Sequence, residues 1–348
     1  MTAEPLAERL ARQIATEGPI TSSAFIDAAL YDPVDGFYGA SAAAGRAGRR
    51  GDFLTSAEVG PLFGAVIARA VDHWWQLAGQ PSRFRVEEHG AGPGTLARAV
   101  LLAAPDVLTA GALQWDLVEQ SAGQRAAHPE HPALRSLDVS AAEAPDVVVA
   151  NELLDNLPFD IVRFDGTVWR RIDVGLHDDR FIAVDGAEVA APPAAAGAVR
   201  GATLPVHHAA RDWIAGRRVS GAKRVVVFDY GAPTAELLGR GGGWLRTFRG
   251  HGEAGDWLAA PGTCDITSDL ALEQLCDDAT VTTQAEWLRG HGIDDLVAAG
   301  RAIWEAGASV GDLAAIRGRS RIGEAEALLD PDGLGGFMVL EWVLAAAG

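Results

Sequence analysis

Glycines at every second position form the most informative segment of the sequence. The segment reads Glu88-His-Gly90-Ala-Gly92-Pro-Gly94-Thr95, and a helical pattern follows it. Glycines allow a sharp turn and a close approach of the backbone to a ligand, and the next helix N-terminus offers free N–H groups. A dinucleotide fingerprint would read Gly-x-Gly-x-x-Gly. The earlier third glycine and the acidic Glu88 instead suit a ligand that carries an ammonium and a sulfonium.

A second acidic residue ends the next predicted strand. Glu119 closes the apolar run Trp115–Val118 and is followed by Gln120. In doubly wound sheets, a carboxylate at this place binds both ribose hydroxyls, in NAD enzymes as well as in others. A tight turn without a ligand, or an exposed acid at a strand end, would explain each signal alone. The two signals together favour a ribose-bearing cofactor.

Polar side chains also follow the third predicted strand, Val147–Ala150. They are Asn151, Glu152, Asp155 and Asn156. In open parallel sheets, ligands bind outside the carboxyl ends of the strands. Asn151 can accept a hydrogen bond from a ligand, and Glu152 and Asp155 can hold or deprotonate a nucleophile. A helix capped by Asn151 is the alternative, and both interpretations can hold together.

The elements that position these residues follow from the hydrophobic pattern. After Phe84, short apolar runs alternate with helical stretches, which predicts an α/β fold with a parallel sheet and crossover helices. Residues 168–174 and 180–184 alternate with period two and predict an inserted hairpin. Two late segments, Thr280–Thr283 and Gly335–Leu344, are candidate final strands.

The first 80 residues are predicted to be mainly helical. Leu6, Leu10 and Ile14 share one helix face, Thr21 or Ser22 is placed to cap a second helix, and a longer helix runs from about residue 58 to 78. We therefore expect an N-terminal helical cap segment over residues 1–80, followed by a domain over residues 81–348.

Composition restricts the class of protein. The chain has 348 residues and a formal net charge of −18, which argues against broad nucleic-acid binding and favours basic partners. It contains no apolar run of the ~20 residues that a membrane span needs, and the first thirty residues lack a signal-peptide core. Cys264 and Cys276 cannot build a disulfide framework or a zinc site. We therefore expect no metal and a cytoplasmic location.

Motifs along nearly the whole chain resemble those of the MidA-like S-adenosylmethionine (SAM) dependent methyltransferases. The glycine turn is shared by all class I methyltransferases, whereas Gly51–Thr55 and Asn151–Pro158 are specific to this family. The other matching blocks are Ala29–Pro33, Gly36–Tyr38, Pro61–Gly64, Leu117–Ser121, Phe228–Gly231, Leu245–Arg246, Asp265–Thr267 and Thr283–Gln284.

The resemblance implies a class I methyltransferase Rossmann-like sheet of seven strands with the last one antiparallel. It also implies an inserted β-hairpin subdomain at about residues 160–222 and SAM as the cofactor. The Gly51–Thr55 loop would close over the methionine end of SAM, and Asp138 would contact the adenine. The predicted cofactor-binding residues are Thr55, Glu88, Gly90, Gly92, Gly94, Thr95, Glu119, Gln120, Asp138 and Asn151.

The function that the resemblance implies is protein arginine N-methylation, because mitochondrial members dimethylate an arginine on a core subunit of respiratory complex I during its assembly. A guanidinium is always protonated, so a carboxylate must localise its charge and accept a proton. The candidate catalytic residues are Glu152, Asp155, Asp52 and Glu58. The expected partner is a protein substrate, with a complex I subunit suggested by analogy, and the expected state is a monomer or homodimer.

Three alternatives to an arginine methyltransferase stay open at this point. They are a SAM-binding assembly factor without catalysis, a methyltransferase with a small-molecule or non-arginine acceptor, and a nicotinamide dehydrogenase. Pro93, His89 and Met338 depart from the family pattern, which has a polar or basic residue, an aliphatic residue and a lysine at these places. His89 is either a base or, as we expect, a packing residue beside the turn.

Overall fold

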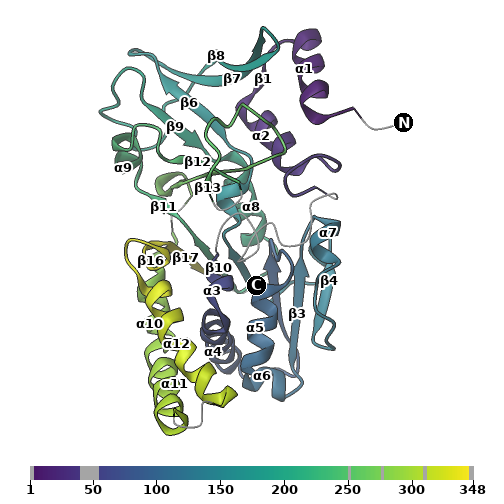
Figure 1. The fold of residues 1–348 in the computed structure, drawn as a ribbon, viewed down its shortest axis with the longest axis vertical. Coiled ribbons are helices and arrows are strands. Elements are labelled where there is room, and N and C mark those ends of the chain that lie inside the picture. The colour runs from purple at the N-terminus through teal and green to yellow at the C-terminus, as the bar shows by residue number, and fades with distance from the viewer. Residues whose placement is uncertain (1–3, 40–54, 250–251, 276–277, 309–311, 345–348) are drawn as a thin grey trace.

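The computed structural model describes residues 4–39, 55–249, 252–275, 278–308 and 312–344. These residues form two lobes that follow one another along the long axis of the molecule (Figure 1). The lower lobe contains a seven-stranded sheet, and the upper lobe contains a smaller sheet together with the first two helices.

The seven-stranded sheet has the order β16-β17-β10-β5-β2-β3-β4. Five of its strands are parallel neighbours, whereas β17 runs antiparallel to both β10 and β16. The predicted α/β class with a mixed seven-stranded sheet is confirmed. The strands are β2 (Phe84–His89), β3 (Leu113–Val118), β4 (Leu134–Leu137), β5 (Val147–Asn151), β10 (Arg224–Asp229), β16 (Thr280–Thr283) and β17 (Met338–Val343).

One face of this sheet is covered by helices that bury a continuous apolar stripe. Helix α4 buries Leu62, Phe63, Val66 and Ile67, which recur at helical spacing and pack against α5 and the sheet. Full burial of each such side chain stabilises the fold by roughly 1.5–3 kcal/mol. The helices of this lobe are α3 (Ser56–Val59), α4 (Pro61–Leu77), α5 (Thr95–Ala103), α6 (Asp106–Thr109), α7 (Ala122–Arg125), α10 (Gln284–Gly290), α11 (Ile293–Gly307) and α12 (Leu313–Leu329).

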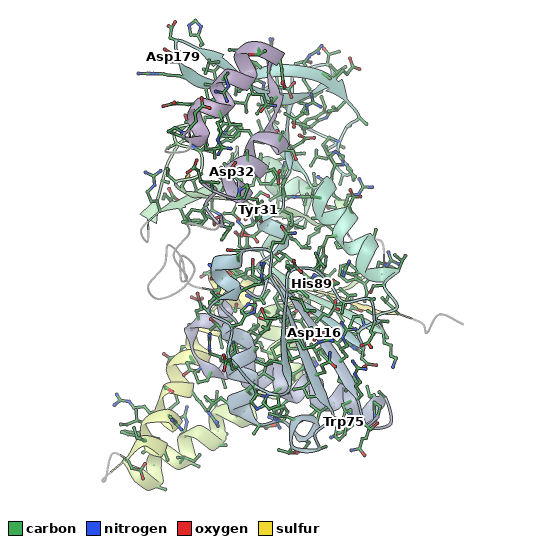
Figure 2. The ribbon with its side chains drawn as sticks, turned by 90° about the vertical axis from the view of Figure 1, so that its right-hand side faces the viewer. Tyr31, Asp32, Trp75, His89, Asp116 and Asp179 are labelled. Carbon is green, nitrogen blue, oxygen red and sulfur yellow. The ribbon has the colours of Figure 1, made fainter. Side chains whose placement is uncertain are left out.

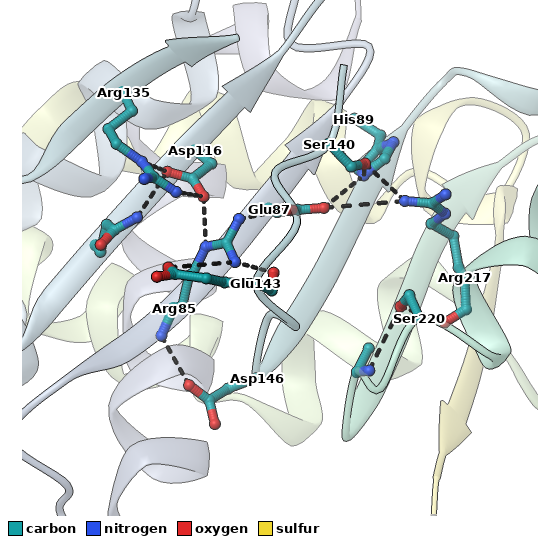
Figure 3. Close-up of polar contacts among 12 residues, drawn as sticks. Arg85, Glu87, His89, Asp116, Arg135, Ser140, Glu143, Asp146, Arg217 and Ser220 are labelled. Atoms are coloured by element: carbon teal, nitrogen blue, oxygen red, sulfur yellow. Dashed lines mark hydrogen bonds and ion pairs between the residues drawn. The ribbon is translucent and has the colours of Figure 1, made fainter.

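The opposite face is divided between an apolar and a charged half. Helix α8 (His208–Arg218) packs Ala210 and Ile214 over β5 and β10. On β2 and β3 the same face carries Arg85 and Asp116, whose Nε and Oδ2 atoms lie 2.6 Å apart (Figure 3). A second carboxylate, Glu87, lies 2.6 Å from the same guanidinium. Buried charges of this kind are tolerated because each is paired.

The upper lobe contains the predicted hairpin. Strands β7 and β8 pair antiparallel and join a sheet of order β1-β7-β6-β9, with β8 beyond β7. A short three-stranded sheet, β13-β12-β14, and the pair β11-β15 complete the β structure. The elements are β1 (Ile20–Thr21), β6 (Asp160–Phe164), β7 (Trp169–His177), β8 (Arg180–Val189), β9 (Thr203–Val206), β11 (Gly231–Ala232), α9 (Thr234–Gly239), β12 (Leu245–Arg249), β13 (Gly252–Glu253), β14 (Asp265–Ser268) and β15 (Leu270–Ala271).

The N-terminal helices are divided between the lobes. Helix α1 (Leu6–Glu17) buries the predicted face of Leu6, Leu10 and Ile14 together with Val174 of β7. Helix α2 (Ser22–Tyr31) is capped by Thr21, whose side chain accepts the N–H of Ala24. Both belong to the upper lobe, whereas α3 and α4 pack in the lower lobe (Figure 1). The domain boundaries at residues 80 and 160–222 stay a prediction.

Within the described residues, no helix is both long enough and apolar enough to span a bilayer.

Candidate active site

A cavity of about 730 Å³ lies where the carboxyl ends of the central strands face the upper lobe. Its size is within the range of ~300–1,000 Å³ that is usual for ligand sites. Tyr31 of α2 and His89 of β2 belong to its wall and lie in the upper and lower lobes, respectively (Figure 2). The predicted residues that line it are Thr55, Glu58, Glu88, Gly90, Gly92, Thr95, Glu119, Gln120, Asp138, Asn151 and Glu152.

The glycine turn adopts a backbone that requires glycine. Gly90, Gly92 and Gly94 have φ angles of 65°, 52° and 77°. A Cβ atom on Gly92 would meet no atom within 4 Å, so a side chain there would extend into open space. Gly94 does not line the cavity; a Cβ on it would lie 2.8 Å from Pro129. The first two glycines therefore border the ligand space, while the third serves the packing of the turn.

Glu119 holds the turn against the end of β3. Its carboxylate accepts the N–H of Gly92 at 2.9 Å and the N–H of Ser121 at 2.7 Å. Burial raises the pKa of Glu119, and these two hydrogen bonds counteract the rise. The carboxylate thus lies at the place where the sequence predicts ribose binding, and the ribose contact itself stays a prediction.

Glu88 is a buried acid below the turn. It is 4% exposed, and its carboxylate accepts the indole N–H of Trp115 at 2.7 Å. Burial raises the pKa of Glu88 to about 8, and the charge of Glu119 adds to the rise. A cation in the cavity would favour ionisation of Glu88, because opposite charge lowers the pKa of a carboxyl group.

Glu152 is the carboxylate of the β5 end that reaches the cavity. Its φ of 52° is unusual for a residue other than glycine and marks local strain, which is common at functional sites. Its Oε1 atom accepts the N–H of Ser56 at 2.8 Å and the side-chain amide of Asn151 at 3.1 Å. Burial raises the pKa of Glu152 to about 8, and the charges of Asp155 and Glu58 contribute.

The other candidate acids are placed differently. Glu58 lines the cavity, and its Oε2 atom accepts the hydroxyl of Thr55 at 3.2 Å in a capping box. Asp155 is 2% exposed and does not line the cavity. Its carboxylate instead accepts the hydroxyl of Thr267 at 2.5 Å. The structure places Asp155 behind the cavity wall, and Asp52 lies outside the described residues.

Ser140 and Arg217, which line the cavity, belong to a polar network with His89 and Glu87 (Figure 3). Arg217 of α8 donates to the hydroxyl of Ser140 at 2.7 Å, and His89 lies 3.4 Å from that oxygen. His89 also lies 3.1 Å from the carboxylate of Glu87, and burial lowers the pKa of its imidazole. His89 is held within this network and also lines the cavity, so its role as a packing residue stays a prediction.

Several residues of the cavity wall were not among the site residues predicted from the sequence. Tyr31, Tyr38, Trp213 and Arg217 line the cavity, and none was a candidate. The two tyrosines lie within motif blocks that resemble the family, so their positions were marked without a role. Trp213 and Arg217 lie on α8, whose sequence shows no feature other than an amphipathic helix.

Comparison with known proteins defines the class. The sequence pattern of a family described as S-adenosyl-L-methionine-dependent methyltransferase matches residues 66–289, which is more than half of the chain. The chain belongs to this family. It is a SAM-dependent methyltransferase, and SAM is its cofactor, so a nicotinamide dehydrogenase is no longer a candidate.

A solved structure extends the likeness to the whole fold. A protein of Burkholderia thailandensis bound to S-adenosyl-homocysteine superposes with a TM-score of 0.83 at 28% sequence identity. The superposition covers 99% of this chain and 92% of that protein. S-adenosyl-homocysteine is the compound that SAM becomes when its methyl group has left, so the related protein holds the product form of this cofactor.

Curated relatives are named as protein arginine methyltransferases, which is more specific than the description of the family. The mitochondrial protein arginine methyltransferase NDUFAF7 of Danio rerio is 26% identical over 335 residues, which cover 82% of this chain and 76% of that protein. Its homologue in Drosophila melanogaster is 38% identical over 96 residues, or 28% of this chain. This local match, like those to several other curated relatives, spans only about a fifth of the relative's length.

The prediction of a cytoplasmic location is contradicted by these relatives. The proteins from Danio rerio and Homo sapiens are mitochondrial, which points to mitochondria and away from the cytoplasm. The prediction relied on the low cysteine content and on the lack of a signal-peptide core. Neither feature distinguishes the cytoplasm from another reducing compartment.

Proposed function

We propose that this methyltransferase modifies an arginine side chain of a protein. The observation that carries the proposal is the strained Glu152, whose carboxylate lines the cavity beside the glycine turn. Glu58 lines the same cavity, so two carboxylates are available to an acceptor that carries positive charge. The names of the curated relatives support arginine as that acceptor.

The residues of the cavity fit SAM. The open space at Gly92 allows close approach of a ligand, and Glu119 lies at the strand end where ribose hydroxyls bind in this class of sheet. The Oδ1 atom of Asn151 is buried and has no hydrogen-bond partner among the described residues. Since a buried acceptor needs a donor, we infer that Asn151 accepts a hydrogen bond from the ammonium of the methionine end.

Methyl transfer to arginine requires the protein to position the guanidinium and to localise its charge. SAM, when bound, supplies a methyl group on a positively charged sulfur. A guanidinium is a weak nucleophile because its charge is delocalised over three nitrogens. We infer that Glu152 pairs with one end of this group, localises its charge and orients the free nitrogen. Closure of the cavity would exclude water that competes for the methyl group.

The acceptor protein is a separate part of the proposal. A subunit of respiratory complex I is the first candidate, by the resemblance to the MidA-like family alone. The predicted monomer or homodimer and the predicted lack of nucleic-acid binding stay predictions.

Arginine methylation is tested with tritiated SAM and total protein from a strain that lacks the gene. After incubation and acid hydrolysis, we expect radioactivity in methylarginine, and we expect it to form about 100-fold more slowly with the Glu152→Gln variant. Radioactivity in another amino acid, or in a small molecule, would show that the methyl acceptor is not arginine. Binding of SAM without any transfer would support the non-catalytic assembly factor.

A further inference from the structure

Several motif blocks that have no role in cofactor binding meet at the cavity wall. Tyr38 and Asn156 line the cavity, whereas Tyr230, Asp265 and Thr267 lie behind it. Tyr230 donates its hydroxyl to Asp155, which also accepts from Thr267. Asn156 donates to Asp265 at 3.0 Å. These contacts form a buried network of tyrosines and carboxylates directly next to the proposed acceptor site.

Two tyrosines of the cavity wall differ in how they contact this network. The rings of Tyr31 and Tyr38 are stacked with their centroids 5.8 Å apart and their planes at 25°. The hydroxyl of Tyr31 donates to the backbone carbonyl of Asn156 at 3.1 Å. The hydroxyl of Tyr38 donates to Oδ1 of Asp265 at 3.1 Å. Tyr38 thus connects the cavity wall to a carboxylate, whereas Tyr31 connects it to a peptide oxygen.

Asp265 is suited to bind and release a proton. It is 1% exposed, and burial raises its pKa to about 7, with the charge of Asp155 adding to the rise. Its hydrogen bonds from Tyr38 and Asn156 lower the pKa and keep the ionised form accessible. The ionisable groups that face this network from the packed elements are Tyr31 of α2, Tyr38, Asp155, Asp229, Tyr230 and Arg246 of β12.

Methylation of a guanidinium releases a proton that must leave the acceptor nitrogen. The lone pair of the acceptor nitrogen forms the new N–C bond, and the electron pair of the broken C–S bond stays on sulfur. The nitrogen then carries one hydrogen too many. A side chain of the wall can take this proton, and Tyr38 lines the cavity with a carboxylate behind it.

We propose that Tyr38 and Asp265 form the path by which this proton leaves the acceptor. The proton passes to the oxygen of Tyr38 while the hydroxyl hydrogen of Tyr38 passes to the carboxylate of Asp265. Tyr38 ends as it began, and Asp265 ends protonated. This inference rests on the proposed function and adds two residues to it: Tyr38 contacts the acceptor, and Asp265 acts through Tyr38.

The stacked tyrosines provide a matched pair of variants. Tyr38→Phe should lower the single-turnover rate of methylarginine formation at least ~10-fold, as expected for loss of acid–base assistance. Tyr31→Phe removes a hydroxyl from the same wall and should lower the rate by less than ~3-fold, because its partner is a peptide oxygen. Affinity for S-adenosyl-homocysteine and the unfolding temperature, measured for both variants, show whether either change acts through the fold.

The pH dependence tests Asp265. Asp265, with a pKa of about 7, and Glu152, with a pKa of about 8, must both be ionised, so the logarithm of the wild-type rate should rise with a slope above one per pH unit below pH 7. Asp265→Asn keeps an oxygen that accepts from Tyr38, and in this variant the slope should fall to that of Glu152 alone, at most one. Infrared spectra of the protein without SAM give a second readout. The C=O band of a protonated carboxyl that titrates near this pH should be present in the wild type and absent in Asp265→Asn.

The outcomes separate the inference from the proposed function. Wild-type protein that methylates no arginine refutes the proposed function, and the proton path falls with it. If the wild type is active, equal rates for Tyr38→Phe and Tyr31→Phe refute the proton path alone. A pH dependence that is as steep in Asp265→Asn as in the wild type, or an unchanged infrared band, refutes it as well.

Discussion

The two walls of the cavity are built in different ways. The proposed cofactor wall consists mainly of backbone: the glycine turn and the ends of β3 and β5, fixed by hydrogen bonds such as that from Gly92 to Glu119. The proposed acceptor wall consists of side chains from distant segments, with Glu152 accepting from Ser56 and Tyr38 donating to Asp265. The first wall depends on local spacing and the second on tertiary contacts.

This difference predicts different responses to mutation. A change in the cofactor wall alters the shape of the backbone and should act on SAM affinity. A change in the acceptor wall removes a charge or a proton acceptor and should act on the rate of transfer. The following variants test that separation.

The largest effect is expected from Gly92→Val. Valine strongly disfavours a φ of 52°, and its side chain would extend into the ligand space, so SAM affinity should fall by more than ~100-fold. Calorimetry measures the affinity. Gly79→Val is the matched control, because Gly79 has a φ of 81° with equally open surroundings but lies away from the cavity. The same loss of affinity in both variants would assign the effect to the fold.

The acceptor wall is tested by Glu152→Gln. Glutamine keeps an oxygen for the N–H of Ser56 but cannot localise a positive charge, so the rate should fall ~100-fold while SAM affinity changes by less than ~5-fold. Glu58→Gln should act more weakly, since Glu58 is already engaged by Thr55. Single-turnover kinetics with tritiated SAM separate the two quantities. A loss of affinity without a loss of rate would contradict the division between the walls.

A smaller effect is expected on stability from Glu88→Gln. The pKa of Glu88 is raised from 4.5 to about 8 in the folded state, so the folded protein binds a proton more tightly than the unfolded chain. Stability from this group is therefore complete below pH 4.5 and is lost as pH rises through about 8. Denaturant unfolding should show that the free energy of unfolding of the wild type decreases from pH 5 to pH 8. In the variant, this decrease should be smaller by roughly 1–3 kcal/mol. An equal drop in both proteins would show that Glu88 is ionised throughout.

The smallest effect is expected from Arg217→Ala. This arginine supports Ser140 beside Asp138, so its loss should weaken SAM binding by roughly 3–10-fold. Its neighbour Arg218 pairs with Asp278 on the surface, and Arg218→Ala should leave the affinity within ~2-fold. Equal SAM affinities for the two variants would show that Arg217 of helix α8 does not contribute to the cofactor site.

The same division explains which features could be predicted from sequence. The apolar run Val147–Ala150 is fully buried as β5, and the spacing of the glycines indicated a sharp turn, in which all three glycines have positive φ angles. Both depend on neighbours in the chain. Tyr38 and Asp265 are 227 residues apart, and no local pattern reports such a pair.

Asp155 shows how a short motif can mislead. It lies three residues after Glu152, and both acids were expected to face the acceptor. The strained backbone at Glu152 and the 3-10 turn Leu154–Asn156 that follows place the second acid behind the wall. The polar strands β12–β14 were likewise missed, because short strands with few apolar residues acquire their conformation from partners elsewhere in the fold.

A crystal structure with S-adenosyl-homocysteine tests the arrangement of the two walls most directly. We expect the ribose hydroxyls at Glu119, the amino acid end at Asn151, and the sulfur facing the side of the cavity that holds Glu152 and Tyr38. A ligand bound with its sulfur turned away from Glu152, or bound outside the glycine turn, would contradict this arrangement.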